Sequence, residues 1–211
     1  MKNKPYYNLL LDQNIVIDGH FKLNAGNHAD TYIQKDKILH KNITREVTTK
    51  LLTNICKIIL TNINYNDFVI TGPAIAGAMF ALPVADKLKL QFAYCEKKII
   101  KYIDNNGDKQ DKTIMHFRPD HAKFIYSKKV IIIEDIITTG RNIIKTISAI
   151  EKCNAEAFAV VYIWNRGDWQ FKPEGYLSKK RFNGIIDKNV DSWLPEECEK
   201  CKHNIPLTQL K

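Results

Sequence analysis

The chain has 211 residues and a mass of 24.4 kDa, with a hydrophobic fraction of 45% and a formal net charge of +9. This size favours one domain with an elaboration over two small domains, and the apolar content is sufficient for a buried core. No apolar run approaches the ~20 residues of a membrane-spanning helix, and residues 1–7 lack the apolar segment of a signal peptide, so we expect a cytoplasmic protein.

The net charge of +9 has three explanations. One is a lysine-rich composition without functional meaning, because isoleucine and asparagine are also abundant. The second is the binding of phosphorylated small molecules, and the third is the binding of nucleic acid. The chain has no basic run of five or more residues, which disfavours nucleic acid but leaves the first two explanations open.

The chain has five cysteines, an odd number, which without an export signal indicates reduced thiols. Cys198 and Cys201 form a CxxC pair near the end of the chain. Structural zinc needs about four ligands, and His203 alone lies nearby in the sequence. We therefore expect a reduced turn here in preference to a zinc or redox site.

The first half of the chain predicts an alternation of elements. Residues 6–12 favour a short helix, and residues 43–63 a long amphipathic helix with Thr44 as its N-cap. Residues 78–88 predict a third helix, with Pro83 as an internal irregularity. Short apolar or alternating runs predict strands at 19–23 and 31–33 around a turn at 24–28, at 68–71 before a turn at 72–77, and at 92–95.

The second half begins with the polar segment 97–120, for which we expect a turn or mobile loop tip at 104–108 and a returning strand at 113–117. The strand at 129–134, the helix at 142–152 and the strand at 157–163 follow. Strands that alternate with helices predict an α/β domain with a mostly parallel central sheet flanked by helices.

The stretch from Val130 to Asn142 carries the strongest chemical signal. Four β-branched residues predict a strand buried on both faces, and Glu134 and Asp135 follow where we expect the strand to end. The turn Thr138–Gly140 precedes a predicted helix, whose free N–H groups and dipole favour a phosphate. Paired carboxylates suit a sugar diol or a carbon that becomes cationic.

This stretch resembles the signature of type I phosphoribosyltransferases, enzymes that couple phosphoribosyl diphosphate (PRPP) to a base. The resemblance implies that Glu134 and Asp135 bind the ribose and act at the reacting carbon. It also implies that PRPP contacts are made by Ile136, Ile137, Thr138, Thr139, Gly140, Arg141 and Asn142. We therefore expect the type I phosphoribosyltransferase fold, with a small hood subdomain.

The turn at 72–77 is similar to the diphosphate-binding loop of the same family. The similarity implies further PRPP contacts from Gly72, Pro73, Ala74, Ala76 and Gly77, with glycines that let the backbone approach the ligand. Magnesium is the implied cofactor, bound mainly through PRPP oxygens without a direct protein ligand.

Two further segments indicate which base is the substrate. Residues 18–35 are similar to the N-terminal segment of orotate phosphoribosyltransferases, and residues 194–207 resemble the C-terminus of many bacterial members, so the likeness spans about 7–207. It implies orotate contacts from Asn24, Gly26, Tyr32, Ile33, Thr138 and Arg166. Ala25, Ala29 and Ala76 depart from the usual family residues, which leaves the strictness of base selection open.

The polar segment resembles the family's basic loop at Lys97 and Lys98, which we expect to contact diphosphate. Lys101 is nearest to the position of the family's catalytic lysine, and a merely solvated side chain is the equal alternative. His116 is a weaker catalytic candidate.

The resemblance implies one domain over residues 1–211, with a hood from about 1–40 plus parts of 165–211 and a core of about 41–164. It implies the reaction of orotate with PRPP in pyrimidine synthesis by a homodimer with shared active sites. A phosphoribosyltransferase for a purine is the nearest alternative. A PRPP-sensing regulator that binds nucleic acid is the second, although no helix-turn-helix segment is apparent.

Overall fold

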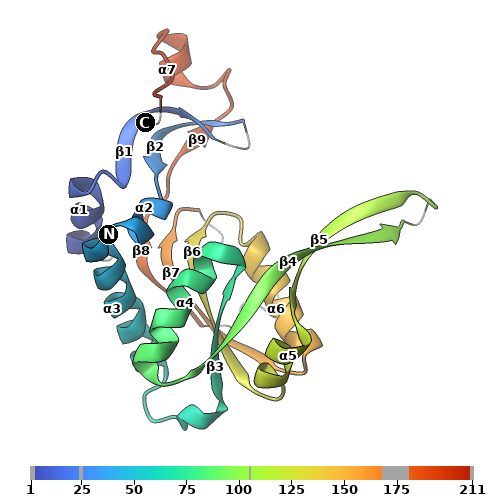
Figure 1. The fold of residues 1–211 in the computed structure, drawn as a ribbon. Helices are drawn as coiled ribbons and strands as arrows, with labels where there is room; N and C mark the ends of the chain where they lie inside the picture. Colours follow the sequence, from blue (N-terminus) through green and yellow to red (C-terminus); the bar gives the residue numbers. More distant parts are fainter. Residues whose placement is uncertain (1–2, 24–25, 105, 168–180, 210–211) are drawn as a thin grey trace.

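The structure is a computed structural model that describes residues 3–23, 26–104, 106–167 and 181–209. The described residues form a six-stranded sheet with the order β5-β4-β3-β6-β7-β8 and a separate three-stranded sheet (Figure 1). All neighbours in the larger sheet are parallel except β4 and β5. This arrangement confirms the predicted α/β class.

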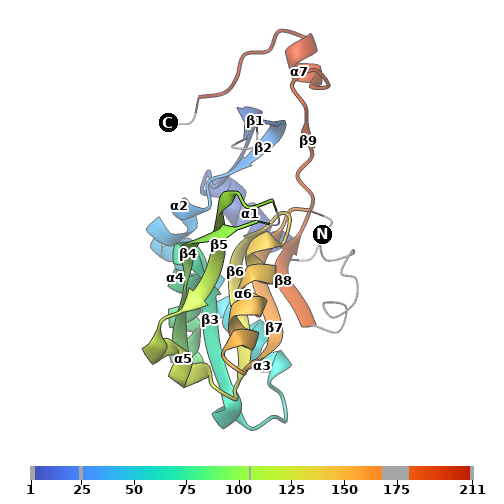
Figure 2. The ribbon, with the colours of Figure 1, turned by 90° about the vertical axis from the view of Figure 1, so that its right-hand side faces the viewer.

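The six strands of the larger sheet are β3 (Phe68–Pro73), β4 (Gln91–Ile103), β5 (Lys109–Phe117), β6 (Lys129–Ile137), β7 (Glu156–Asn165) and β8 (Arg181–Asp187). A 3₁₀ turn, η1 (Tyr65–Asp67), leads into β3. One face packs against α1 (Lys4–Asp12), α3 (Asn42–Ile59) and α4 (Ala74–Leu88), and the other against α5 (Pro119–Ile125) and α6 (Arg141–Lys152) (Figure 2).

Strand β6 lies at the centre and is buried on both faces. Ile131 and Ile133 belong to the apolar cluster under α3 and α4, while Val130 and Ile132 belong to the cluster under α5 and α6. Successive side chains of a strand point to opposite faces, so a continuous apolar run is what a doubly covered strand requires. The prediction for this strand is confirmed.

Two predicted boundaries close to the centre of the sheet were wrong. Strand β6 continues to Ile137, so the two carboxylates lie within the strand and not after it. Helix α4 begins at Ala74, so the predicted turn at 72–77 includes the helix's first turn. Proline does not hinder this start, because Pro73 precedes the helix with an extended backbone.

Thr44 is not the N-cap of α3. Lys41 occupies that position, and the Thr44 hydroxyl donates instead to the carbonyls of Ile38 (2.9 Å) and Lys41 (3.0 Å). The helix also ends at Ile59, four residues before the predicted end.

The polar segment forms a long antiparallel hairpin of β4 and β5 that stands clear of the body (Figure 1). Pairing runs from Cys95 opposite Phe117 to Ile103 opposite Lys109. The Asp104 carboxylate accepts hydrogen bonds from the N–H groups of Asn106 and Asp108, which forms the predicted tip.

The smaller sheet joins both ends of the chain. It consists of β1 (Val16–Lys22), β2 (His28–Ile33) and β9 (Ser192–Trp193), with α2 (Asp36–His40) after β2 and α7 (Glu199–Lys202) after β9. We call this unit the hood; its boundary near residue 40 stays a prediction. In the described part of the chain, no helix is long and apolar enough to cross a bilayer.

Gly184 in β8 offers a test of the packing between β7 and β8. A Cβ atom at this position would lie 1.9 Å from the Tyr162 ring, which is buried. We expect Gly184→Ala to lower the free energy of unfolding by about 1–3 kcal/mol, because overpacking forces neighbours to move. Denaturant unfolding measures this, with Asn183→Ala in the same strand as the control. Equal stability of the Gly184 variant and the parent would contradict the packing.

Candidate functional site

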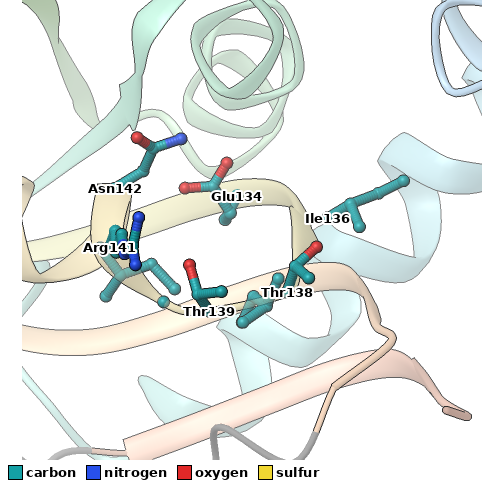
Figure 3. A pocket seen from close by; sticks show the side chains of 9 residues that line it. Glu134, Ile136, Thr138, Thr139, Arg141 and Asn142 are labelled. Atoms are coloured by element: carbon teal, nitrogen blue, oxygen red, sulfur yellow. The ribbon is translucent and has the colours of Figure 1, made fainter. Parts of the chain in front are cut away.

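A cavity of about 300 Å³ lies at the carboxyl end of β6. Figure 3 shows the polar ends of Glu134, Thr138, Thr139 and Asn142 around one hollow. The lining consists of Glu134, Ile136, Ile137, Thr138, Thr139, Gly140, Arg141, Asn142 and Ile143. Apart from Ile143, all were predicted from the sequence to contact PRPP.

The turn that forms this cavity depends on Gly140. Its φ of 68° is left-handed, a conformation that costs glycine little, and α6 begins at the next residue. No described side chain caps this helix N-terminus. The N–H groups of its first turn are therefore available to an anion, together with the positive end of the helix dipole.

The second predicted loop packs directly against β6. A Cβ at Gly72 would lie 2.2 Å from the backbone carbon of Gly77, and a Cβ at Gly77 would lie 2.8 Å from the carbonyl oxygen of Ile133. Both glycines are therefore required by close approach of the backbone. The first turn of α4 meets β6 one residue before Glu134, so the structure brings the two segments predicted to bind PRPP together.

Glu134 is buried, and its Oε2 atom has no hydrogen-bond partner among the described residues. Burial, followed by repulsion from the Asp135 carboxylate, raises the pKa of Glu134 well above its ordinary value. A buried carboxylate oxygen at the wall of a cavity can accept a hydrogen bond from a ligand hydroxyl or face a developing positive charge.

Asp135 makes an ion pair that the sequence did not predict. Lys35, which follows β2 in the hood, donates to Asp135 Oδ2 at 2.7 Å. Partial burial lowers the pKa of Lys35, but the Asp135 carboxylate outweighs it, and the pKa is raised overall. The two residues are 100 positions apart, and no local motif connects them.

Arg166 also lies at this end of the sheet. Its Nε atom donates to the Thr138 hydroxyl at 2.9 Å, and its N–H donates to the Ile137 carbonyl. Burial lowers the pKa of Arg166, and Tyr32 of the hood opposes this shift. A Cβ at the next residue, Gly167, would lie 2.5 Å from the Thr138 carbonyl oxygen, so the segment after β7 lies tightly against the turn Thr138–Gly140.

The remaining predicted residues are more dispersed. Lys97, Lys98 and Lys101 are exposed on β4 and make no ion pair within the described chain. The Ile33 side chain is buried in the core, and Gly26 (φ 93°) lies in the β1–β2 turn. Asn24 and Ala25 lie outside the described residues.

The comparisons with known proteins agree with this geometry. A family model, the phosphoribosyl transferase domain, matches residues 40–193. An orotate phosphoribosyltransferase of Chlorobaculum parvum is 26% identical over 98% of this chain and 94% of its own length. One from Sulfurovum sp. is 29% identical over 90% of each chain.

Solved structures share the fold at lower identity. Orotate phosphoribosyltransferase from Aeropyrum pernix matches with a TM-score of 0.61 and 18% identity, covering 85% of this chain and 92% of that one. Adenine phosphoribosyltransferase from Trypanosoma brucei matches with a TM-score of 0.64 and 16% identity, covering 89% and 81%. Because enzymes for two different bases match about equally well, the fold alone does not select the base.

Glu134 predicts a distinctive pH dependence of stability. A raised pKa means that the folded state binds more protons, so stability falls as the pH rises from the unfolded value of about 4.3 through the folded value. The Glu134→Gln variant has no carboxyl group at this position, so it does not lose stability in this way as the pH rises. We expect the variant's melting temperature to match that of the parent near pH 4 and to exceed it increasingly at higher pH.

Thermal melts of the ligand-free protein between pH 4 and 8 measure this difference. Glu151→Gln, at an exposed position on α6, is the matched control and should follow the parent curve. A constant difference across the pH range would mean that Glu134 is not held in a costly buried state.

Proposed function

The chain belongs to the phosphoribosyl transferase family, and we propose that it joins orotate to PRPP, giving orotidine 5′-monophosphate and diphosphate. In this reaction the bond from the ribose carbon to the diphosphate oxygen breaks, a bond to the orotate ring nitrogen forms, and that nitrogen loses its proton. The supporting observation is the cavity at the end of β6 with Arg166 fixed beside it, in a chain similar over nearly its full length to orotate phosphoribosyltransferases.

In this proposal the turn from Thr138 to Asn142 holds the 5-phosphate of PRPP through backbone N–H groups and hydroxyls. Glu134 and Asp135 accept hydrogen bonds from the ribose hydroxyls. A carboxylate beside the ribose carbon stabilises the positive charge that develops there, and this charge favours the ionised form of Glu134 against the effect of burial on its pKa.

The orotate carboxylate is assigned to Arg166. A guanidinium offers a planar fork of donors that matches a carboxylate. The Thr138 hydroxyl, which accepts from Arg166 Nε, connects this base site to the phosphate turn. Tyr32 approaches from the hood, while a role for Ile33 falls to its backbone because its side chain is buried.

The proposal includes Mg²⁺. The unpartnered, buried Glu134 Oε2 fits such an ion, because Mg²⁺ prefers hard oxygen donors and is held mainly by substrate phosphates and water. When bound, the ion would neutralise charge on the diphosphate.

We also propose that the β4–β5 hairpin acts as the basic loop, with Lys97, Lys98 and Lys101 as its cations, and that it reaches the active site of a second copy in a homodimer. Ile99 and Ile103 support this role, because each is 67% exposed on an arm that stands clear of its own body. A cytoplasmic location is part of the same proposal.

Orotate consumption tests the reaction directly. With PRPP and Mg²⁺ present, we expect the purified protein to consume orotate, seen as a change in its ultraviolet absorbance. Adenine and uracil in place of orotate should give no turnover, and a chelator should stop the reaction.

Turnover of adenine alone would contradict orotate as the substrate, but the family assignment would still hold. Absence of any turnover together with RNA binding that weakens as salt rises would favour the regulator instead.

Arg166→Ala tests the base site. Loss of a charge-assisted contact worth about 1.5–3 kcal/mol should raise the KM for orotate roughly ten- to a hundredfold, with a much smaller effect on the KM for PRPP. Steady-state kinetics measures both constants. Arg45→Ala on the exposed side of α3 is the control and should change neither. An unchanged KM for orotate, or an equal rise in the KM for PRPP, would contradict the assignment of Arg166 to the base site.

A further inference from the structure

Four potential metal ligands converge in the hood, far from the cavity in the sequence and in the fold (Figure 1). They are His20 on β1, His28 at the start of β2, Cys198 just before α7 and Cys201 within α7. Their ligand atoms all lie within 4.8 Å of one another, and all except Cys201 are buried. His203 is the one candidate ligand near the CxxC pair in the sequence, and the fold adds His20 and His28, which no sequence spacing connects to it.

The backbone arrangement places these side chains together. The pairing of β1 with β2 shifts register between Asp18 and Phe21, a bulge that turns the His20 and Phe21 side chains both inward. His28 pairs with Trp193 of β9, so the strand that leads to Cys198 ends beside it. The N–H of Thr208 donates to the His20 carbonyl at 2.6 Å, which holds the end of the tail over the same strand.

The separations match a tetrahedral zinc site. With Zn–N near 2.05 Å and Zn–S near 2.3 Å, tetrahedral geometry requires about 3.3 Å between two nitrogens and about 3.6 Å between nitrogen and sulfur. His20 Nε2 lies 2.9 Å from His28 Nδ1, 3.4 Å from Cys198 Sγ and 3.6 Å from Cys201 Sγ. Cys201 Sγ lies 3.2 Å from His28 Nδ1. Shifts of a few tenths of an ångström in these four separations, and of up to about an ångström in the two that remain, would admit the ion.

The hydrogen bond on the far side of His20 fixes the ring in the form that a metal requires. His20 Nδ1 lies 2.7 Å from the carbonyl oxygen of Ile205, which can only accept, so Nδ1 carries the proton. In a neutral imidazole the other nitrogen, Nε2, is then a bare lone pair, and it faces His28 and both sulfurs. A backbone carbonyl behind a ligating histidine is a common partner in metal sites.

From this geometry we propose that His20, His28, Cys198 and Cys201 bind one structural Zn²⁺ that fastens the C-terminal tail to the hood. Four protein ligands close the coordination shell, and Cys₂His₂ with a CxxC pair is a ligand set of structural zinc. The site does not depend on the proposed reaction, because none of its ligands lines the cavity.

Two other arrangements use the same four residues. In one, a proton on His28 Nδ1 bridges to His20 Nε2 and the thiols remain free; in the other, Cys198 and Cys201 form a disulfide. The first leaves two sulfurs with only weak hydrogen bonds in a buried polar cluster. Metal analysis and thiol counting separate both from the zinc site.

The test measures metal in the full-length protein, purified without chelators from cells grown with added zinc. We expect one zinc per chain by elemental mass spectrometry. Growth with cobalt in place of zinc should give the visible absorption of tetrahedral Co²⁺ and a near-ultraviolet thiolate charge-transfer band. These measurements on the unmodified chain do not require a variant to fold.

Variants then assign the ligands. Cys201→Ser and His28→Ala should each lose most of the zinc and the cobalt spectrum, and should lower the melting temperature. His203→Ala, on the same tail, and Cys153→Ser, a thiol elsewhere, are matched controls that should keep both. Substoichiometric zinc in the unmodified protein, retention of metal by both ligand variants, or a Cys198–Cys201 disulfide in freshly purified protein would overturn the proposal.

Discussion

The central constraint on this fold is that β6 carries two carboxylates near its end that are buried from bulk water. Parallel strands hold both of its edges, helices cover both faces, and yet Glu134 and Asp135 are buried at 4% and 5% exposure. Such carboxylates are costly unless they are paired or face a ligand. In this fold Glu134 faces a cavity, and Asp135 is paired with Lys35.

The position of β6 also gathers the loops. Because β3 and β7 flank it in parallel, the segments that follow these three strands all emerge at one edge of the sheet. Gly72 and Gly77 come from one side, Arg166 and Gly167 from the other, and the turn Thr138–Gly140 lies between them. The Lys35–Asp135 ion pair connects the hood to this edge of the sheet.

The sequence predicted what local rules determine. The apolar run of β6, the Thr-Thr-Gly turn and the amphipathic α6 follow from periodicity and backbone preference, and all three were confirmed. Resemblance extended the prediction to the loop after β3 and to Arg166. Their proximity to the cavity is visible only in the fold, because it depends on strand order.

Other features were beyond local rules. Thr48, Thr49 and Thr53 lie on the buried side of α3. Each hydroxyl donates to the carbonyl four residues earlier, so the buried hydroxyl has a hydrogen-bond partner. Ile58 shares the apolar spacing of that helix yet is 74% exposed. Lys35 pairs with Asp135, 100 residues away, and His20 lies beside Cys198, 178 residues away. No spacing rule covers such pairs.

The small sheet of the hood also sets an order of events during synthesis. Its first two strands precede the whole larger sheet in the chain, whereas their partner β9 and the contact at Thr208 follow it. Domains generally begin to fold from the N-terminus as the chain emerges, but this hairpin receives its third strand only after the strands of the larger sheet have been made. A ribosome that stalls before residue 192 would therefore leave the first strands of the protein without their third.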